Sequence, residues 1–148
     1  MMRSDFKFWE EVVVRWGDMD ALGHVNNAKF FTYAESGRLG YMAKLDLMRF
    51  RRHEYEGPGL VSAVLNFRKQ VRFPDVLELG VRVSEMRTRS FTFSIEMYRK
   101  GTEVVVADGL SVGVWVDYRA EKAVSLPEAL RAVVIQFEGR ADIDRANP

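Results

Sequence analysis

The sequence predicts an α+β fold in which one antiparallel β-sheet wraps around a single long helix, with a second helix near the C-terminus. Three observations support this prediction. A β-branched segment comes first, a helical segment follows it, and the second half consists mostly of alternating apolar and polar residues. Such alternation is typical of antiparallel strands with one buried face. The 148 residues contain no linker or repeat, which indicates one domain over residues 1–148.

The first strand and the long helix are expected in the N-terminal third. Residues 8–15 include three consecutive valines and are typical of a strand. A turn rich in Gly and Asp follows over 17–24, and an Asn pair then favours a helix over 26–42. Gly37 lies on the apolar face of this helix. Because Gly is unfavourable inside a helix, its presence there suggests close packing against a sheet.

The remaining strands are expected after a polar segment with a weak helical pattern, residues 45–56. Residues 60–73 are extended in character, and Pro74 marks a turn. Three alternating runs follow, which indicate a meander. Their apolar positions, which we expect to face the core, are Leu77, Leu79, Val81 and Val83, then Phe91, Phe93, Ile95 and Met97, and then Leu110, Val112, Val114 and Val116.

A short C-terminal helix is expected to about Phe137. The sequence Ser-Leu-Pro-Glu at 125–128 matches a capping box with Pro near the first turn. The apolar pattern then ends, so we expect residues 139–148 to be a flexible tail.

Composition excludes several kinds of chemistry. Because there is no Cys, disulfides, thiol nucleophiles and iron–sulfur clusters are excluded. The two histidines are too few for a three-His zinc site within one chain. A formal charge of +1 argues against nucleic acid as a partner. No apolar stretch is long enough to cross a membrane, and the N-terminus lacks the apolar core of a signal peptide. We expect a cytoplasmic protein without stable membrane insertion.

The segment 18–27 carries the strongest chemical signal. It places two carboxylates, an imidazole and two carboxamides directly before a helix. The first N–H groups of a helix have no intrahelical acceptor, so they can stabilise negative charge on a carbonyl oxygen. A nearby carboxylate can attack that carbonyl or activate a water. The alternative is that the aspartates only shape a turn and that an Asn only caps the helix.

The string Asp-Met-Asp-Ala-Leu-Gly-His-Val-Asn-Asn at 18–27, followed by an aromatic helix, resembles the active-site signature of the hotdog-fold acyl-CoA thioesterases. It is most similar to the 4-hydroxybenzoyl-CoA thioesterase-like branch. The resemblance covers nearly the whole chain, including the order of strand, motif, helix and meander. It implies a hotdog fold and an enzyme that hydrolyses an acyl thioester to a carboxylic acid and free CoA.

The resemblance also implies roles for single residues. Asp20 matches the catalytic carboxylate, acting as nucleophile or general base. The backbone N–H of Asn27 matches the group that polarises the carbonyl, and His24 matches a histidine that orients the carboxylate or the attacking water. The plant acyl-carrier-protein thioesterases have a similar string, but Leu22 stands here where they have a catalytic Asn. That departure leaves Asp20 as the main candidate. The wall of the acyl pocket is expected to include Phe30, Phe31, Tyr33 and residues 60–67, which would accept either an aromatic or an aliphatic chain.

Three other polar residues have simpler interpretations. Glu35 is a second carboxylate candidate, because another hotdog branch places its catalytic carboxylate on the central helix, but we interpret it as a helix-surface or partner-contact residue. Asp18 is interpreted as structural and His53 as solvated. Ser111 lies in a Gly-x-Ser-x-Gly string, yet it falls inside a predicted strand and both histidines precede it. We therefore interpret it as an outward-facing strand residue and not as a hydrolase nucleophile.

Substrate binding is expected in the basic segment 68–100, which has eight basic and four acidic residues. Arg binds phosphate well through charge-assisted contacts. In the family, a basic turn between two meander strands contacts the CoA phosphates, and Arg87, Arg89 and Ser90 resemble that turn. The alternative is an ordinary solvated sheet face.

The resemblance implies an acyl-CoA or acyl-carrier-protein thioester as substrate, no metal or redox cofactor, and a homodimer or a dimer of dimers. An exposed sheet edge independently favours self-association. Two alternatives stay open: a non-catalytic acyl-CoA-binding module, and a hydratase or dehydratase that leaves the thioester intact.

Overall fold

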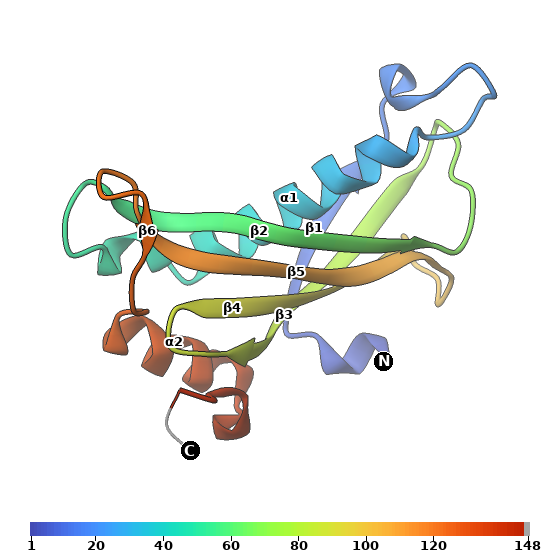
Figure 1. Ribbon diagram of the computed structural model, residues 1–148. Coiled ribbons are helices and arrows are strands. Elements are labelled where there is room, and N and C mark those ends of the chain that lie inside the picture. Colours follow the sequence, from blue (N-terminus) through green and yellow to red (C-terminus); the bar gives the residue numbers. More distant parts are fainter. Residues whose placement is uncertain (147–148) are drawn as a thin grey trace.

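The centre of the computed structural model, which describes residues 1–146, is one antiparallel sheet with the strand order β1-β3-β4-β5-β2 (Figure 1). A short strand, β6, pairs with β5 beyond this path. The strands are β1 (Phe8–Val13), β2 (Glu56–Phe67), β3 (Val76–Met86), β4 (Ser90–Arg99), β5 (Val105–Asp117) and β6 (Lys122–Ala123). The two α-helices are α1 (Asn27–Lys44) and α2 (Glu128–Glu138). The predicted α+β architecture is confirmed.

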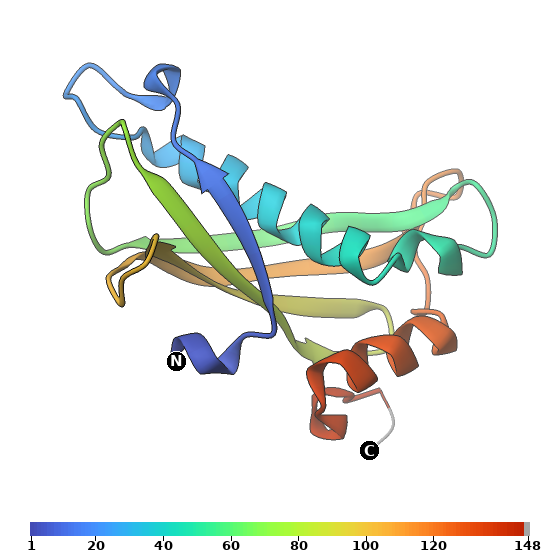
Figure 2. The ribbon, with the colours of Figure 1, turned by 180° about the vertical axis from the view of Figure 1, so that it is seen from behind.

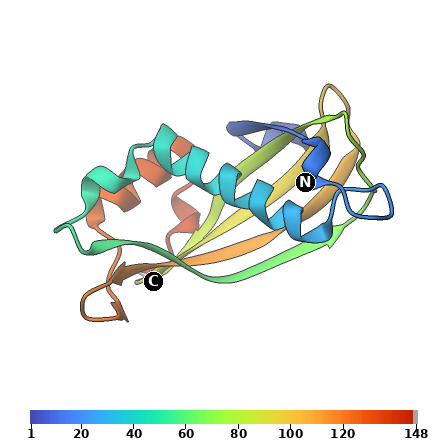
Figure 3. The same cartoon turned by 90° about the horizontal axis from the view of Figure 1, so that it is seen from above.

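Helix α1 lies along the concave face of the curled sheet (Figures 2 and 3). Gly37 allows a close approach, because a Cβ built at this position would lie 3.0 Å from Cγ2 of Val81 and 3.3 Å from Cδ2 of Leu79. Tyr41, one turn later, is completely buried and packs edge-on against Phe93, with ring centroids 5.4 Å apart. The expected tight packing of helix on sheet is therefore confirmed.

The predicted inward faces of β3 and β4 are confirmed. Leu77, Leu79 and Val81 are all fully buried, and Phe93 opposes Ser111 across the ladder between β4 and β5. Residues directly opposite each other in an antiparallel pair lie on the same face. The inward position of Phe93 therefore places Ser111 inward too, and Ser111 is 1% exposed, so the outward-facing position predicted for Ser111 is wrong.

The predicted face of β5 is consequently wrong. The four aliphatic residues expected in the core face outward instead, and Leu110 is 50% exposed. They are Leu110, Val112, Val114 and Val116. The inward residues of β5 are small apart from Trp115, because the large rings of β4 occupy the space above them. At Gly113 a Cβ would lie 2.6 Å from Cζ of Phe91. Period-two alternation identified the strand but not its buried side.

Helix α2 covers the end of the core beyond α1. Its N-cap is Pro127, without a side-chain cap, so the predicted capping box is wrong; the Ser125 hydroxyl accepts a hydrogen bond from Arg52 at 3.4 Å instead. At the other end of α2, the buried carboxylate of Glu138 accepts a 2.6 Å hydrogen bond from the Tyr41 hydroxyl. Burial and this carboxylate raise the pKa of Tyr41 above its ordinary value.

The segment after α2 packs against the molecule, in contrast to the expected flexible tail. Ile143 is 2% exposed, and Arg131 of α2 forms a 2.7 Å ion pair with Asp144. Asp144 also forms a bridge to Met86 at the end of β3. Residues 139–146 thus close one end of the core, and residues 147–148 of the expected tail lie outside the described part of the chain.

The connection between α1 and β2 contains a single 3₁₀ turn, Leu47–Phe50, where a weak helical pattern was expected. Strand β2 then starts at Glu56, earlier than predicted, and forms one edge of the sheet. Within residues 1–146, neither helix has the length and apolar character needed to cross a membrane.

Candidate active site

The loop between β1 and α1 carries most of the predicted catalytic residues, and Asp18 holds this loop in place. Asp18 is 8% exposed. Its carboxylate accepts hydrogen bonds from the Tyr33 hydroxyl at 2.6 Å and from the Arg15 amide at 3.0 Å. Burial opposes ionisation of Asp18, but these hydrogen bonds outweigh it and bring the pKa of the carboxyl below its ordinary value. The structural role expected for Asp18 agrees with these contacts.

Asp20 lies two residues later, exposed to solvent. Its Oδ1 accepts hydrogen bonds from the amides of Leu22 at 2.9 Å and His24 at 3.3 Å. The Asp20 amide donates to the His24 carbonyl at 2.8 Å, and Gly23 completes the turn with a φ of 82°. The backbone therefore fixes the direction of the Asp20 side chain. Among the described residues, no group donates to its second oxygen, Oδ2.

The side chain of His24 has its hydrogen bond with a different residue: its Nδ1 accepts a 3.3 Å hydrogen bond from Nε of Arg72. An accepting Nδ1 leaves the proton of the neutral ring on Nε2. The structure thus brings the main chain of His24 to Asp20 and its imidazole to Arg72. Sequence analysis did not single out Arg72, because no local pattern connects it to the loop.

The start of α1 lies directly after this turn. Asn26 is the N-cap, and its Oδ1 accepts a 3.0 Å hydrogen bond from the Ala28 amide. The amide of Asn27, the first helical residue, has no acceptor among the described residues. This amide and the positive end of the helix dipole therefore face solvent beside the Asp20 turn, where they can bind a carbonyl oxygen that gains negative charge.

The side chain of Phe30, which is expected in the wall of the acyl pocket, lies inside the protein. It is 2% exposed and packs edge-on against Tyr33 and Phe67, with centroids 5.8 Å and 5.5 Å away. Phe30 is thus a core residue that supports α1. The neighbouring Phe31 is 39% exposed and Phe67 is 43% exposed, so these two rings form the aromatic surface near the loop.

The turn at 87–90 lies at the opposite end of the sheet from the Asp20 loop (Figure 1). Arg87 is exposed and pairs with Glu85 at 3.0 Å, Arg89 is exposed, and Ser90 is the first residue of β4. Strand β3, which runs between the two ends, is eleven residues long. At about 3.3 Å per residue it spans roughly 30 Å. Within one chain, the structure does not bring the predicted phosphate contacts and the predicted catalytic residues together.

A model of the thioesterase-like superfamily matches residues 14–134. The chain belongs to this superfamily. It is a thioester hydrolase, as the sequence predicts, and its hotdog fold is confirmed.

Individual relatives of this thioesterase are distant but match over most of its length. It is 25% identical to the long-chain acyl-CoA thioesterase FadM of Escherichia coli (strain K12) over 127 residues, which cover 86% of this chain and 96% of that protein. Among solved structures, the PA2801 protein of Pseudomonas aeruginosa is 25% identical with a TM-score of 0.79, over 87% of this chain and 98% of that one. A thioesterase superfamily protein from Jannaschia sp. CCS1 is also 25% identical, with a TM-score of 0.80, over 92% of this chain and 86% of that one.

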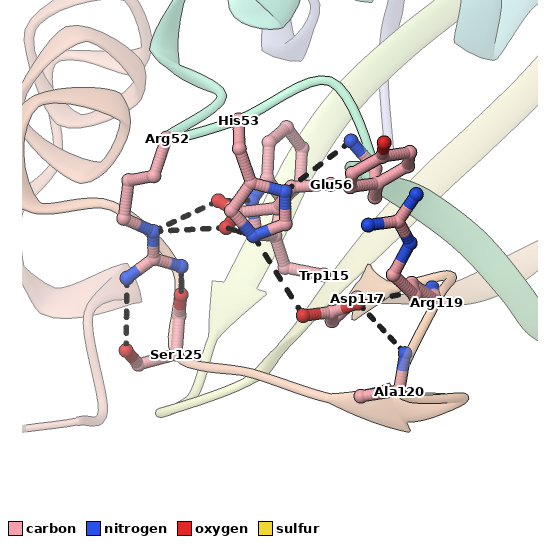
Figure 4. A network of polar contacts seen from close by, with 9 residues as sticks. Arg52, His53, Glu56, Trp115, Asp117, Arg119, Ala120 and Ser125 are labelled. Carbon is pink, nitrogen blue, oxygen red and sulfur yellow. Dashed lines mark hydrogen bonds and ion pairs between the residues drawn. The ribbon is translucent and has the colours of Figure 1, made fainter.

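Sequence analysis of this thioesterase missed one polar cluster, shown in Figure 4. Its centre is the carboxylate of Glu56, which is 3% exposed and accepts hydrogen bonds from the Trp115 indole and from Nε of Arg52. Burial opposes ionisation of Glu56, but the Trp115 and Arg52 contacts lower its pKa below the ordinary value. The imidazole of His53 is exposed, as expected, and lies 3.6 Å from this carboxylate and 3.7 Å from that of Asp117.

This cluster forms one wall of an open depression of about 760 Å³, which Arg89 and Lys122 also line. The predicted phosphate contact Arg89 therefore lies beside further cationic side chains at this end of the sheet. The local spacing of Arg52, His53 and Glu56 could have indicated part of this cluster. Their contacts with Trp115 and Asp117 of β5 form only in the folded sheet, and no local pattern records them.

Proposed function

We propose that this thioesterase hydrolyses an acyl-CoA thioester, with Asp20 as the catalytic carboxylate and the N–H group of Asn27, at the positive end of the α1 dipole, as the oxyanion site. One observation carries the proposal: the Asp20 carboxylate is exposed and oriented by the loop backbone, directly before the unpaired amide of Asn27. The similarity to FadM, which acts on long-chain acyl-CoA, supports CoA as the carrier.

Hydrolysis of a thioester needs a group that attacks the carbonyl carbon or activates a water, and a donor that stabilises the charge on the carbonyl oxygen. Asp20 and the Asn27 amide supply these two functions. Asp20 either attacks the carbonyl carbon itself, forming an anhydride that water then opens, or takes a proton from the attacking water. In both routes the carbon–sulfur bond breaks, the acyl group leaves as a carboxylic acid, and the sulfur leaves as the CoA thiol. The Asn27 amide stabilises the charge on the carbonyl oxygen during the addition step. His24 acts as a positioning residue, since its amide donates to the Asp20 carboxylate.

A thiol-release assay over short, long and aromatic acyl-CoAs tests this proposal, with Asp20→Asn as the decisive variant. Asn keeps an oxygen for the amides of Leu22 and His24, so the turn is preserved. We expect kcat to fall about 100-fold or more while the Tm stays unchanged. The matched control is Asp142→Asn, at an exposed ion pair with Arg140, which should keep full activity.

Two results would contradict the proposal. If the wild type and Asp20→Asn release thiol equally slowly while both bind CoA, the protein is a non-catalytic binding module. If the product retains the thioester and its mass changes by one water, the protein is a hydratase or dehydratase.

We also propose that the active form is a homodimer joined at the β2 edges. Strand β2 is twelve residues long, and its Val61 is 60% exposed beside an interruption in the ladder with β5. Antiparallel pairing of two such edges places the Phe67 end of one strand beside the Glu56 end of the other. The Asp20 loop of one subunit then lies at the same end as the 87–90 turn of a second copy, so Arg87, Arg89 and Ser90 can bind the CoA phosphates there.

Light scattering after size-exclusion chromatography tests the dimer. We expect a dimer, or a pair of dimers, for the wild type, and a monomer with low activity for Val61→Asp. The control Val61→Thr keeps the branched shape and should stay dimeric. A monomeric wild type with full activity would refute this part of the proposal. The cytoplasmic location stays a prediction, which cell fractionation can check.

A further inference from the structure

A second cavity lies between α1 and the strands β2, β4 and β5, separate from the Asp20 turn. Its volume is about 200 Å³, and most of its lining is apolar, including Met42, Leu60 and Phe93. Two charged side chains also line it, Arg38 and Glu35, both from α1. The cavity is therefore an apolar chamber with one cation and one anion from the same helix.

Two glycines lie where the backbones of β2 and β5 border this chamber. Gly59 on β2 and Gly113 on β5 both line it, and Gly113 lies opposite Leu60 in the ladder. The β2–β5 ladder is interrupted directly after Leu60. Larger side chains at these two glycines would meet occupied space, because a Cβ at Gly113 would lie 2.6 Å from the Phe91 ring and one at Gly59 would lie 3.1 Å from Val116.

Arg38 reaches through this space to the sheet. Its Nη1 donates a 3.0 Å hydrogen bond to the hydroxyl of Ser111, which is 1% exposed. A guanidinium carries five N–H donors, and this bond uses one of them. Among the residues that the structure describes, no carboxylate lies within 4.0 Å of the Arg38 nitrogens, Glu35 included.

A partly buried cation with one neutral partner is energetically unfavourable on its own. Burial accordingly lowers the pKa of Arg38, and the nearby charge of Glu35 only partly offsets this effect. A carboxylate that entered the chamber would supply the missing countercharge and could accept two parallel hydrogen bonds from the guanidinium. The chamber thus suits an elongated apolar group with an anionic end.

The chamber and the proposed oxyanion site lie along the same face of α1. Asn27, Phe31, Glu35 and Arg38 follow one another at helical spacings and share one face of α1. Arg38 comes eleven residues after Asn27, which corresponds to about 16 Å along the helix axis. An acyl chain whose carbonyl lies at the helix start can therefore follow this face toward the chamber.

We propose that the chamber holds the far end of the acyl group and that Arg38 selects acyl chains ending in a carboxylate, the monothioesters of dicarboxylic acids. This inference rests on the proposed function and adds a substrate class to it. Arg38 acts as a specificity-determining residue, and Ser111 holds its guanidinium in place.

The test compares matched pairs of substrates whose extended chains can reach from the helix start to Arg38: the monothioesters dodecanedioyl-, tetradecanedioyl- and hexadecanedioyl-CoA against lauroyl-, myristoyl- and palmitoyl-CoA. For each pair, the ratio of kcat/KM values is measured in the wild type and in Arg38→Met. We expect the wild type to prefer the carboxylated substrates and the variant to lower the ratio about 30-fold or more. The control Arg140→Met, at an exposed position, should keep the wild-type ratio. An equal loss on both substrates, or no wild-type preference, would overturn the proposal.

A binding measurement keeps this inference separate from hydrolysis itself. Free suberate and free octanoate are titrated into the wild type, Arg38→Met and Arg38→Lys while the Tm is recorded. We expect suberate to raise the Tm of the wild type more than octanoate does, Arg38→Met to lose this difference, and Arg38→Lys to keep part of it. If suberate stabilises the wild type and Arg38→Met equally, the inference fails even if thioesters are hydrolysed. If no thioester is hydrolysed but the Tm increase caused by suberate still requires Arg38, only the proposed function fails.

Discussion

The Tyr33 hydroxyl donates a 2.6 Å hydrogen bond to the carboxylate of Asp18, which connects helix α1 to the loop that carries Asp20. The backbone strengthens this connection, because the carbonyl of Asp18 accepts a 2.9 Å hydrogen bond from the Asn26 amide. The same loop residue thus binds both the side of α1 and its N-cap. Asp20 itself is exposed, so its position depends on these neighbouring contacts.

Removing the Tyr33 hydroxyl should destabilise the protein. In Tyr33→Phe the buried Asp18 carboxylate loses a short hydrogen bond, and we expect the free energy of unfolding to fall by about 1–3 kcal/mol. Urea denaturation measures this change. The control is Tyr55→Phe, since the Tyr55 hydroxyl has no hydrogen-bond partner within the described residues. Similar losses in both variants would contradict the role of the Tyr33–Asp18 contact.

The stability contributed by Asp18 should depend on pH in a defined direction. Its pKa is lower in the folded protein than its ordinary value of 3.8, so the unfolded chain binds a proton more readily. The contribution is therefore complete above about pH 4 and is lost as the pH falls through the lowered pKa. We expect Asp18→Asn to lower the free energy of unfolding by more at about pH 7 than at about pH 3, with the difference shrinking further as the pH falls. A difference of the same size at both pH values would argue against this assignment.

The close contact of α1 with β3 predicts a steric effect at Gly37. Gly37→Val places methyl groups against Val81 and Leu79, and we expect a loss of about 1–3 kcal/mol in the free energy of unfolding. The neighbouring variant Ser36→Val, on the exposed side of the same helix, controls for the low helix propensity of Val. It should cost about 0.5 kcal/mol or less. Equal decreases of Tm in the two variants would show that the close packing around Gly37 does not cause the loss of stability.

The packed C-terminal segment predicts a measurable role for Ile143. Because this side chain is 2% exposed, Ile143→Ala should create a cavity and cost about 2–4 kcal/mol. The matched control is Val104→Ala, in the turn before β5, where the side chain is 37% exposed and the cost should be well below 1 kcal/mol. An unchanged Tm for Ile143→Ala would mean that residues 139–146 behave as the flexible tail predicted from sequence.

Local patterns predicted the order and type of the main elements because each pattern reflects burial along a single segment. Alternation located β3, β4 and β5, and the Asn pair located the start of α1. The buried side of β5 depends on its partners instead: the inward rings of β4 require small residues opposite them, so Ser111 and Gly113 face inward and Leu110 faces solvent. The capping box at Ser125 failed for a similar reason, because Arg52 binds that hydroxyl from a distant loop.

By itself, the sequence determined the fold class, the family and the string of residues around Asp20, since each of these is encoded in contiguous positions. Only the tertiary structure decided which side chains meet. It separated the 87–90 turn from the Asp20 loop by the length of β3, buried Phe30 in the core and left Phe31 exposed. It also joined Arg38 to Ser111 across the interior. These relationships arise from strand pairing and helix packing between residues far apart in the chain, and no local pattern records them.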